Sequence, residues 1–389
     1  MNMFQRTPLA WNNLTHRPRR LIVSLMGVGF GVLLMFMETG FRNALFDSTV
    51  GVVRAIKGDI LIVSQARYTL TTSQAFDFSR VQMARSCVGV ATATPLYIEP
   101  YFGFWREETQ GSYPIRVLAF HLQDDLLDFD GITRSGRRLE IPYSALVDRK
   151  SKQQYGMPTN DSPSRRFELS GRALRVVGSF EMGTDFVNDG NLIMSAENFE
   201  RFFRYRGRGA EPLTGVDIGV VRVEPGANPQ EVKRSLNNLL PADVTVLTKQ
   251  EFIDREIKFW EKSTPVGFIF LVGTIMGFLI GAIICYQVIY SLNEDYMSEF
   301  ATLKAMGYQP AFFIRLVVLQ SLYLSILAFI PGFAVSWLLF RFVSHATGLL
   351  MAFNIERVAV VLALTVAMCL LAGTLAMRKV LAGDPAELF

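Results

Sequence analysis

Four stretches of this sequence contain no charged residue at all. They run over Leu21–Met37, Ser263–Asn293, Leu316–Phe340 and Val358–Met377. A bilayer core is crossed by roughly 20 apolar helical residues, so the last three stretches are long enough to span it and the first nearly so. Elsewhere, roughly a quarter of the residues are charged, as in ordinary soluble proteins. The pattern predicts an α-helical membrane protein with four transmembrane helices and a soluble part, and excludes a single soluble domain, a disordered chain and a collagen-like fibre.

The basic residues predict the direction of crossing. Four arginines and no acidic residue precede the first span, and Arg378 and Lys379 follow the last one. By the positive-inside rule, the N- and C-termini are cytoplasmic, and residues 42–262 lie outside the cytoplasm. A cleaved signal peptide is the alternative. Because no small-residue cleavage site follows the first apolar run, we expect an uncleaved anchor.

Residues 42–262 are numerous enough to bury a core of their own. Short β-type runs alternate there with helical signals, which predicts an α+β extracytoplasmic domain inserted between transmembrane helices 1 and 2. The signals are predicted strands at Asp59–Ser64, Pro114–Phe120, Val216–Val223 and Val244–Leu247, a hairpin turn at Ser170-Gly171 between Phe167–Leu169 and Leu174–Phe180, an N-cap at Asn228 before Pro229, and a capping box of Thr248 and Glu251.

Both junctions between this domain and the membrane are predicted to be helical. Apolar residues recur there at intervals of three to four, at Phe41, Leu45, Val52 and Ile56, and at Phe252, Ile253, Ile257 and Trp260. Two interpretations stay open. The helices are either surface helices of the domain or a rigid stalk that transmits motion between membrane and domain.

The predicted order of segments follows directly. It is a cytoplasmic N-terminal segment (1–20), helix 1 (21–41), the extracytoplasmic domain with stalk helices (42–262), helix 2 (263–293), a cytoplasmic segment (294–311), helix 3 (312–341), a short periplasmic loop (342–356), helix 4 (357–377) and a cytoplasmic tail (378–389).

Most catalytic signatures are missing from the sequence. There is no Gly-Lys dipeptide and therefore no Walker A phosphate loop. His121 is the only histidine in the predicted external domain, which leaves no His pair for a metal. The net charge of +4 gives no footprint for nucleic acid. We therefore expect a chain that is not an enzyme, with no cofactor or metal and no nucleic-acid partner. A membrane-anchored enzyme is the weakest alternative.

Glycines recur at helix-packing intervals in two spans. Gly273, Gly277 and Gly281 lie four apart in the second predicted span, and Gly27 and Gly31 do so in the first. Small residues at this interval let helix backbones approach closely. The pattern predicts either packing within one chain or a homodimer interface, and leaves the two open.

The segment between the second and third spans carries the most specific pattern. Glu299, Phe300, Ala301, Thr302, Leu303, Lys304, Ala305, Met306 and Gly307 read as a short helix closed by a glycine, and the chain ends Gly383-Asp384-Pro385-Ala386-Glu387-Leu388-Phe389. With one span, a large insertion and three more spans, the whole chain resembles the MacB/FtsX-type permeases of ABC transporters. The resemblance implies that residues 299–307 form the coupling helix, which docks on a separate ATPase subunit.

Further residues resemble the DevC-like branch of that family. They are Ala10-Trp11 to Arg20-Leu21, Leu34-Met35-Phe36-Met37, Gly40-Phe41-Arg42, Ala44-Leu45-Phe46-Asp47-Ser48, Asp189-Gly190-Asn191-Leu192 and Leu247-Thr248-Lys249-Gln250-Glu251-Phe252. This branch implies a periplasmic membrane-fusion adaptor, a TolC-type outer-membrane channel and, in cyanobacterial members, glycolipid export. MacB itself carries its nucleotide-binding domain at the N-terminus, whereas only 20 residues precede the first span here. We therefore expect ATP and Mg²⁺ to bind in a partner ATPase.

These observations predict the permease subunit of an ABC exporter in the bacterial inner membrane. It would be a homodimer embedded in membrane lipid, and it would expel a lipid-like or amphiphilic substrate by mechanotransmission. Two alternatives from the same family are an FtsX-like regulator of a periplasmic cell-wall hydrolase and a lipoprotein-releasing permease. No residue in the sequence identifies the substrate.

Overall fold

The computed structural model describes residues 7–16, 18–107, 111–158, 167–185, 187–206, 213–297, 299, 302–303, 306–347 and 353–382. The chain divides into two compact units. The first, the membrane unit, comprises Met1–Asn43, Val266–Val343 and Met351–Phe389. The second, the inserted domain, comprises Ala44–Pro265 and Ser344–Leu350.

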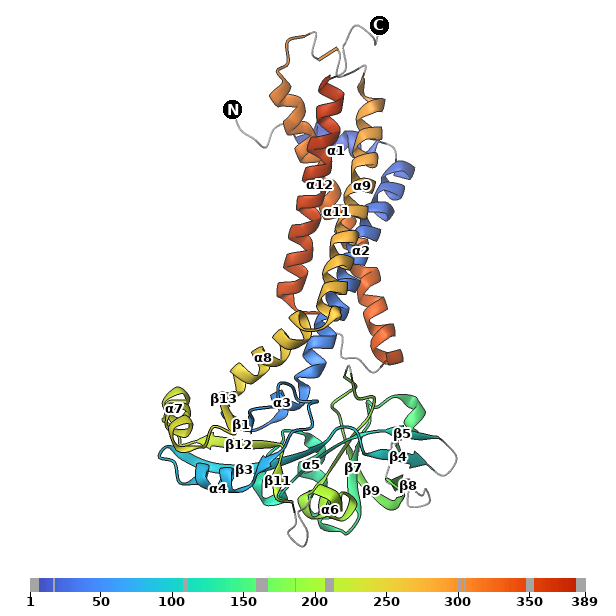
Figure 1. Cartoon of the computed structure of the whole chain (residues 1–389). Coiled ribbons are helices and arrows are strands. Elements are labelled where there is room, and N and C mark those ends of the chain that lie inside the picture. The colour runs from blue at the N-terminus through green and yellow to red at the C-terminus, as the bar shows by residue number, and fades with distance from the viewer. Residues whose placement is uncertain are drawn as a thin grey trace. The chain divides into compact units, whose positions relative to one another are not determined.

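Four helices in the described part of the chain are long and apolar enough to cross a membrane (Figure 1). One lies near the N-terminus, and the other three follow the α+β domain, which confirms the predicted fold class. The protein is a multi-pass membrane protein. A short helix that the sequence analysis did not predict comes before the first span. The helices are α1 (Thr7–Thr15), α2 (Pro18–Thr49), α9 (Pro265–Asp295), α11 (Pro310–Thr347) and α12 (Ile355–Ala382).

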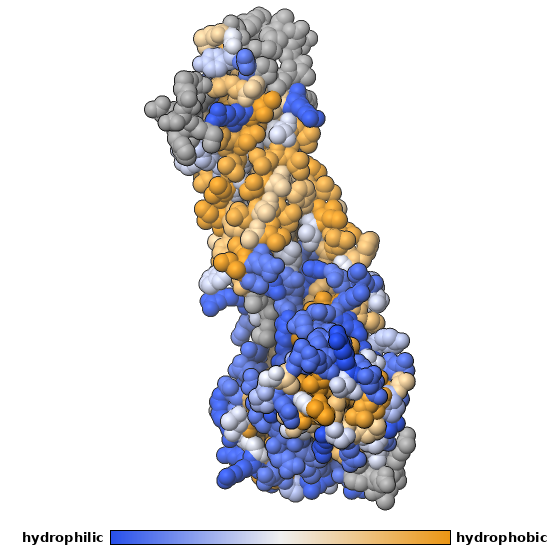
Figure 2. Space-filling model, turned by 90° about the vertical axis from the view of Figure 1, so that its left-hand side faces the viewer, coloured by the Kyte–Doolittle hydropathy of each residue, from blue (hydrophilic) through white to orange (hydrophobic). Residues whose placement is uncertain are grey.

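The membrane helices bury one apolar core and expose a second set of apolar side chains. The core includes Val32 and Phe36 of α2, Ile289 of α9, Leu324 of α11 and Met368 of α12. Large side chains on the outer surface remain exposed, and Figure 2 shows this part of the molecule as mainly orange. Because lipid tails are as apolar as these side chains, such a surface is stable in a bilayer.

Pro331 and Gly332 lie inside α11, where the sequence predicts a kink or a break. The helix does not break and continues through both residues from Pro310 to Thr347. Gly332 packs closely on α2, since a Cβ there would lie 2.9 Å from the carbonyl oxygen of Gly29. Packing against a neighbouring helix is one of the ways in which membrane helices tolerate Pro and Gly.

A mixed sheet forms the centre of the inserted domain (Figure 1). In the described residues it has 11 strands in the order β13-β1-β12-β3-β6-β10-β7-β9-β8-β4-β5, and β2 and β11 form a separate pair. Two neighbouring pairs, β6–β10 and β7–β9, are parallel, and the other neighbours are antiparallel. The strands are β1 (Ile60–Ser64), β2 (Phe76–Asp77), β3 (Val90–Glu99), β4 (Phe104–Glu107), β5 (Ser112–Pro114), β6 (Arg116–Phe120), β7 (Ser144–Asp148), β8 (Phe167–Leu169), β9 (Arg172–Phe180), β10 (Asn191–Ser195), β11 (Gly215–Val216), β12 (Ile218–Val223) and β13 (Val244–Thr248).

Helices cover both faces of this sheet. Alternate residues of β1 point to opposite faces: Ile60 and Ile62 join an apolar cluster with α4, α6 and α7, while Leu61 and Val63 join one with α3, α5 and α8. Burial on both faces explains why β1 is a continuous apolar run. The helices are α3 (Gly51–Ala55), α4 (Ser79–Arg85), α5 (Asp130–Ser135), α6 (Ala196–Phe202), α7 (Pro229–Leu239) and α8 (Lys249–Lys262), with 3₁₀ turns η2 (Leu122–Asp124), η3 (Gly136–Glu140), η4 (Gln153–Tyr155) and η5 (Arg204–Arg206).

The local signals in the sequence are confirmed. The Asn228 side chain accepts a hydrogen bond from the Gln230 N–H, with Pro229 at the first helical position of α7. Thr248 and Glu251 form a complete capping box at the start of α8. Two strand predictions are wrong in part. The run Pro114–Phe120 is divided at Ile115 between β5 and β6. The run Val216–Val223 is interrupted at Asp217, whose buried carboxylate joins an ion-pair network, and gives β11 and β12.

The predicted junction helices pack on the domain. After α2 ends at Thr49, the short helix α3 buries Val52 and Val53 in the cluster to which Phe252 and Ile253 of α8 also belong. The contacts agree with the interpretation of these helices as surface helices of the domain. Transmission of motion stays a prediction.

Candidate functional site

The segment between α9 and α11 ends in a tight helical closure. The Met306 N–H donates to the Thr302 carbonyl at 3.0 Å, and the Tyr308 N–H donates to the Leu303 carbonyl at 3.1 Å. Gly307 between them has a φ of +90°. A hydrogen bond spanning five residues around a left-handed glycine is the Schellman motif, which ends helices. The glycine therefore fixes where the segment stops.

The side chains of this segment face in different directions. Leu303 is half-buried and packs against the apolar core of the membrane helices, whereas Met306 is 63% exposed. Glu299 and Thr302 are also exposed. The sequence predicts Phe300, Leu303 and Met306 on one outward face, but the structure separates Leu303 from Met306. Phe300, Ala301, Lys304 and Ala305 lie outside the described residues.

The helix α1 lies beside this segment and was missed by the sequence analysis. Its Ala10 belongs to the apolar core of the membrane helices, its Leu14 is also buried, and the Tyr296 hydroxyl donates to the Asn13 carbonyl at 3.3 Å. Trp11 contacts Tyr323 of α11 edge-to-face, with ring centroids 5.6 Å apart. The sequence does contain a signal for this helix, because the apolar residues Ala10 and Leu14 are four apart and Pro8 stands in the first turn.

The glycines of the first two spans meet within one chain. A Cβ on Gly31 would lie 2.8 Å from the Cα of Gly281, and one on Gly27 would lie 2.6 Å from the Ile284 side chain. Gly277 faces Leu34 and Met35 of α2, and Gly273 faces Glu38. These glycines therefore pack α2 on α9 within one chain, and a homodimer interface stays a prediction.

A buried carboxylate lies on α8 in the inserted domain. Glu256 is only 1% exposed, and its oxygens accept the Leu70 N–H at 2.9 Å and the Trp260 indole N–H at 3.0 Å. Burial raises the pKa of Glu256 to about 7, although the two hydrogen bonds and the nearby Arg255 act in the opposite direction. Glu256 lies three to four residues from Phe252, Ile253 and Trp260, so the apolar stripe of α8 already placed it on the buried face.

A second buried carboxylate organises the segment after β1. The Asp217 carboxylate accepts hydrogen bonds from the Arg67 guanidinium at 2.5 Å, from the Ile98 N–H at 2.8 Å and from the Arg206 guanidinium. Arg67, also fully buried, donates to the carbonyls of Leu70 and Gln74. Because the Leu70 N–H also donates to Glu256, both buried carboxylates hold the same loop, Glu256 directly and Asp217 through Arg67.

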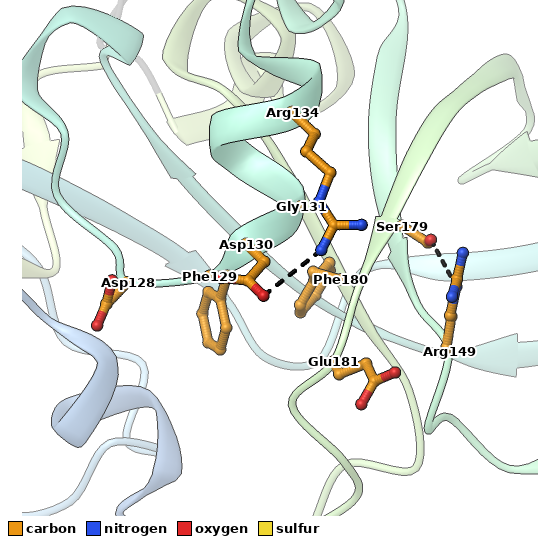
Figure 3. A pocket seen from close by; sticks show the side chains of 9 residues that line it. All are labelled: Asp128, Phe129, Asp130, Gly131, Arg134, Arg149, Ser179, Phe180 and Glu181. Atoms are coloured by element: carbon orange, nitrogen blue, oxygen red, sulfur yellow. Dashed lines mark hydrogen bonds and ion pairs between the residues drawn. The ribbon is translucent and has the colours of Figure 1, made fainter.

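A polar pocket of about 350 Å³ lies between α5 and the C-terminal ends of β7 and β9 (Figure 3). Two hydrogen bonds join side chains that line this pocket. Arg149 donates to the Ser179 hydroxyl at 2.7 Å, and Arg134 donates to the Asp130 carboxylate at 3.4 Å. The described residues contain no group of three or more His, Cys, Asp or Glu side chains placed to hold a metal. The pocket is lined by Asp128, Phe129, Asp130, Gly131, Arg134, Arg149, Ser179, Phe180 and Glu181.

Comparison with known proteins bears mainly on the membrane helices. Residues 270–385 match the family model described as the FtsX-like permease C-terminal region. The match covers most of α9, the segment between α9 and α11, and all of α11 and α12, and it supports the resemblance to MacB/FtsX-type permeases for this part of the chain. A comparison with curated proteins found no match.

Three solved structures resemble the chain over about half its length. The periplasmic region of MacB from Actinobacillus actinomycetemcomitans is 14% identical, covering 51% of this chain and 92% of that one, with a TM-score of 0.36. The extracellular domain of the noncanonic ABC-type transporter YknZ from Gram-positive bacteria is 9% identical, covering 49% and 98%, with a TM-score of 0.34. A domain of a putative permease protein from Porphyromonas gingivalis is 15% identical, covering 49% and 88%, with a TM-score of 0.33.

Proposed function

We propose that this chain is the permease subunit of an ATP-driven ABC exporter that works by mechanotransmission. The single observation that carries the proposal is the match of residues 270–385 to FtsX-like permeases, which includes the connecting segment. A separate ATPase hydrolyses ATP, and two copies of the permease form the membrane part. The inserted domain lies outside the cytoplasm and delivers a lipid-like or amphiphilic substrate, such as a glycolipid, to a periplasmic adaptor and an outer-membrane channel, as in the DevC-like branch.

On this proposal, the segment 299–307 receives the movement of the ATPase. Its closure at Gly307 and the packing of Leu303 against the membrane core connect the segment firmly to the helices. Exposed Met306 is then the apolar contact offered to a partner. Movement of the segment tilts α9 and α11, and α9 follows α8 in the chain, so the inserted domain moves with them.

The experiment is a reconstitution of the full chain with its ATPase subunit. Met306→Asp places a charge in the proposed contact, where an unpaired buried charge costs several kcal/mol. We expect loss of ATPase binding in co-purification and loss of permease-dependent ATP hydrolysis. Met306→Leu keeps the apolar volume and should bind as the wild type does. ATPase binding by Met306→Asp at the wild-type level would contradict the proposed docking face.

The alternative function is that of an FtsX-like regulator, which would have the same membrane helices but would transport nothing. An FtsX-like regulator would activate a cell-wall hydrolase in response to ATP hydrolysis and would move no amphiphile. The reconstituted complex separates the two: ATP-dependent release of a labelled amphiphile supports the exporter. ATP-dependent activation of a hydrolase without such release supports the regulator.

A further inference from the structure

Three aromatic side chains on the inserted domain are exposed although their backbone is held in place. Tyr101 is 45% exposed, Phe102 60% and Tyr205 58%. Tyr101 and Phe102 follow β3, while Tyr205 lies more than a hundred residues later in η5. The rings of Phe102 and Tyr205 nevertheless meet edge-to-face, with centroids 6.1 Å apart. Two distant segments therefore present their aromatic side chains at one place.

A buried carboxylate holds these rings in position. Glu99, 1% exposed, accepts the N–H groups of Tyr101 at 3.3 Å and Phe102 at 3.1 Å through one oxygen, and the Tyr205 hydroxyl through the other. The Ser170 hydroxyl donates to the Phe102 carbonyl at 3.0 Å and ties in the β8–β9 hairpin. Clustered aromatic exposure on a fixed backbone is typical of binding surfaces.

Arginines occur in the same chain segments as these rings and in the adjoining hairpin. Arg172, two residues after Ser170 in the hairpin, donates to the Arg201 carbonyl, and exposed Arg204 directly precedes Tyr205. The segments 100–106, 170–172 and 201–206 contain no Asp or Glu at all. Arg206 binds Asp217, and Arg106 stands opposite Glu168 in the β4–β8 register. Arg201 donates to the neutral amide oxygen of Asn198 at 2.9 Å, and Arg172 to a backbone carbonyl. With exposed Arg204, these arginines outnumber the one buried carboxylate, Glu99, that contacts the rings.

We propose that this aromatic–arginine surface, formed by Tyr101, Phe102, Tyr205, Arg172, Arg201 and Arg204, binds an anionic amphiphile. The rings take the apolar chain, and the guanidiniums take a carboxylate or phosphate headgroup, which their planar donor fork fits in a bidentate manner. The positive charge selects an anionic headgroup over a zwitterionic one. The proposal rests on the proposed export of an amphiphile and names the charge class of that substrate.

The test is photo-crosslinking on the full chain in phosphatidylcholine nanodiscs, without ATP or partner subunits. Two diazirine-labelled probes, a dodecanoate and a dodecyl phosphate, distinguish carboxylate from phosphate recognition, and dodecylphosphocholine with the same label is the zwitterionic comparator. Labelled peptides are mapped by mass spectrometry. We expect at least one anionic probe to label residues 99–106 and 201–206, and the zwitterionic probe to label them less.

Two variants and two matched controls test the named side chains. Phe102→Ser should reduce labelling by about tenfold through loss of apolar contact, and Arg204→Ser by about fivefold through loss of one charge. Tyr68→Ser and Arg134→Ser change exposed side chains elsewhere on the same domain and should leave labelling unchanged. Circular dichroism of each variant confirms that the domain is folded.

Three results would overturn the inference. They are equal labelling by the zwitterionic probe, labelling that survives both variants, and self-association of the chain that Phe102→Ser abolishes, which would assign the surface to a second copy. The assay needs no ATPase, so its failure leaves the permease proposal standing. Loss of ATPase coupling in the Met306 experiment would likewise leave the binding result intact.

Discussion

Glycine serves opposite purposes in the two units of this protein. In the membrane unit, Gly31 and Gly281 allow two helix backbones to touch, and a Cβ on Gly31 would lie 2.8 Å from the neighbouring Cα. In the inserted domain, Gly171 has a φ of +76° in a hairpin turn and has nothing within 4 Å. Gly31 is required because the neighbouring helix leaves no room for a Cβ, whereas Gly171 is required because its backbone is left-handed. The same substitution therefore fails for different reasons in the two units.

Buried polar groups differ between the units as well. The inserted domain surrounds Asp217 and Glu256 with hydrogen-bond donors, as described above. Among the described residues, buried atoms without a hydrogen-bond partner occur in both units: the amide atoms of Asn293 and the Oε1 atom of Gln320 in the membrane unit, and the Ser151 hydroxyl and the Arg255 Nε atom in the inserted domain. The domain is distinguished by its two buried carboxylates with several donors each, and the membrane helices by their close backbone contacts at glycine. Four predictions test this contrast.

The largest effect is expected at Asp217. Asp217→Ala leaves the buried guanidinium of Arg67 without its carboxylate, and breaking a buried pair in this way costs roughly 3–5 kcal/mol. We expect chemical denaturation to show a domain destabilised by that amount, with the membrane helices unaffected in hydrogen exchange. Asp130→Ala removes an exposed carboxylate of the same domain as the control. If the domain of Asp217→Ala unfolds with the free energy of the wild type, the buried ion pair does not stabilise the domain and the contrast between the two units fails.

Glu256 should make the stability of the domain depend on pH. Its pKa is about 7 in the folded domain, above the usual 4.5, because of burial. Between these values the folded state keeps a proton that the unfolded state has lost, so the free energy of unfolding falls as pH rises from about 4.5 to 7, by roughly 3 kcal/mol. Denaturation of the wild type and of Glu256→Gln across this range checks the sign. The variant should lack the slope, and an identical slope in both would assign it to another group.

Gly31 tests the packing of the membrane helices. Gly31→Ala puts a methyl group into the contact with Gly281, and such overpacking costs typically 1–3 kcal/mol. We expect faster hydrogen exchange in α2 and α9 and a lower melting temperature in detergent. Gly277→Ala is the graded comparison, since its Cβ would lie at 3.3 Å, and Gly51→Ala is the open control. Equal stability of all three variants would disprove the intramolecular contact.

The smallest effect is expected at Gly307. Gly307→Ala strains the left-handed residue that closes the connecting segment, at a cost of about 1 kcal/mol. Gly307→Asn should be milder, because Asn tolerates this conformation better than Ala. Hydrogen exchange at Tyr308, whose N–H bonds Leu303, measures the closure directly. If the alanine and asparagine variants exchange alike, the strain at Gly307 does not control the closure.

Local signals with a defined spacing could be predicted from the sequence. The capping box at Thr248, the Asn228–Pro229 start of α7 and the four spans depend on residues close together in the chain, and the structure contains all of them. The glycine pattern predicted close helix packing and left open whether it lies within one chain or between two. It did not say which helices meet, because spacing within a helix carries no information about its partner.

The features that the sequence could not reveal depend on distant residues. Asp217 looks like an interruption in a strand until Arg67 and Arg206 are placed beside it. Leu303 and Met306 are three residues apart and both apolar, yet only the packing of the membrane helices decides which of them is covered. The aromatic–arginine surface combines three segments that only the folded sheet brings together.

The joint at Thr248 has a mechanical meaning. Thr248 is the last residue of β13 and also the N-cap of α8, so no free linker separates the sheet from this helix. At the other end, only Ser263 and Thr264 stand between α8 and α9, and Pro265 restricts the backbone of Thr264. The helix α8 is therefore continuous with the sheet at one end and two residues away from α9 at the other. On the proposed mechanism, the stiffness of this two-residue joint would set how much of the movement of α9 reaches the sheet.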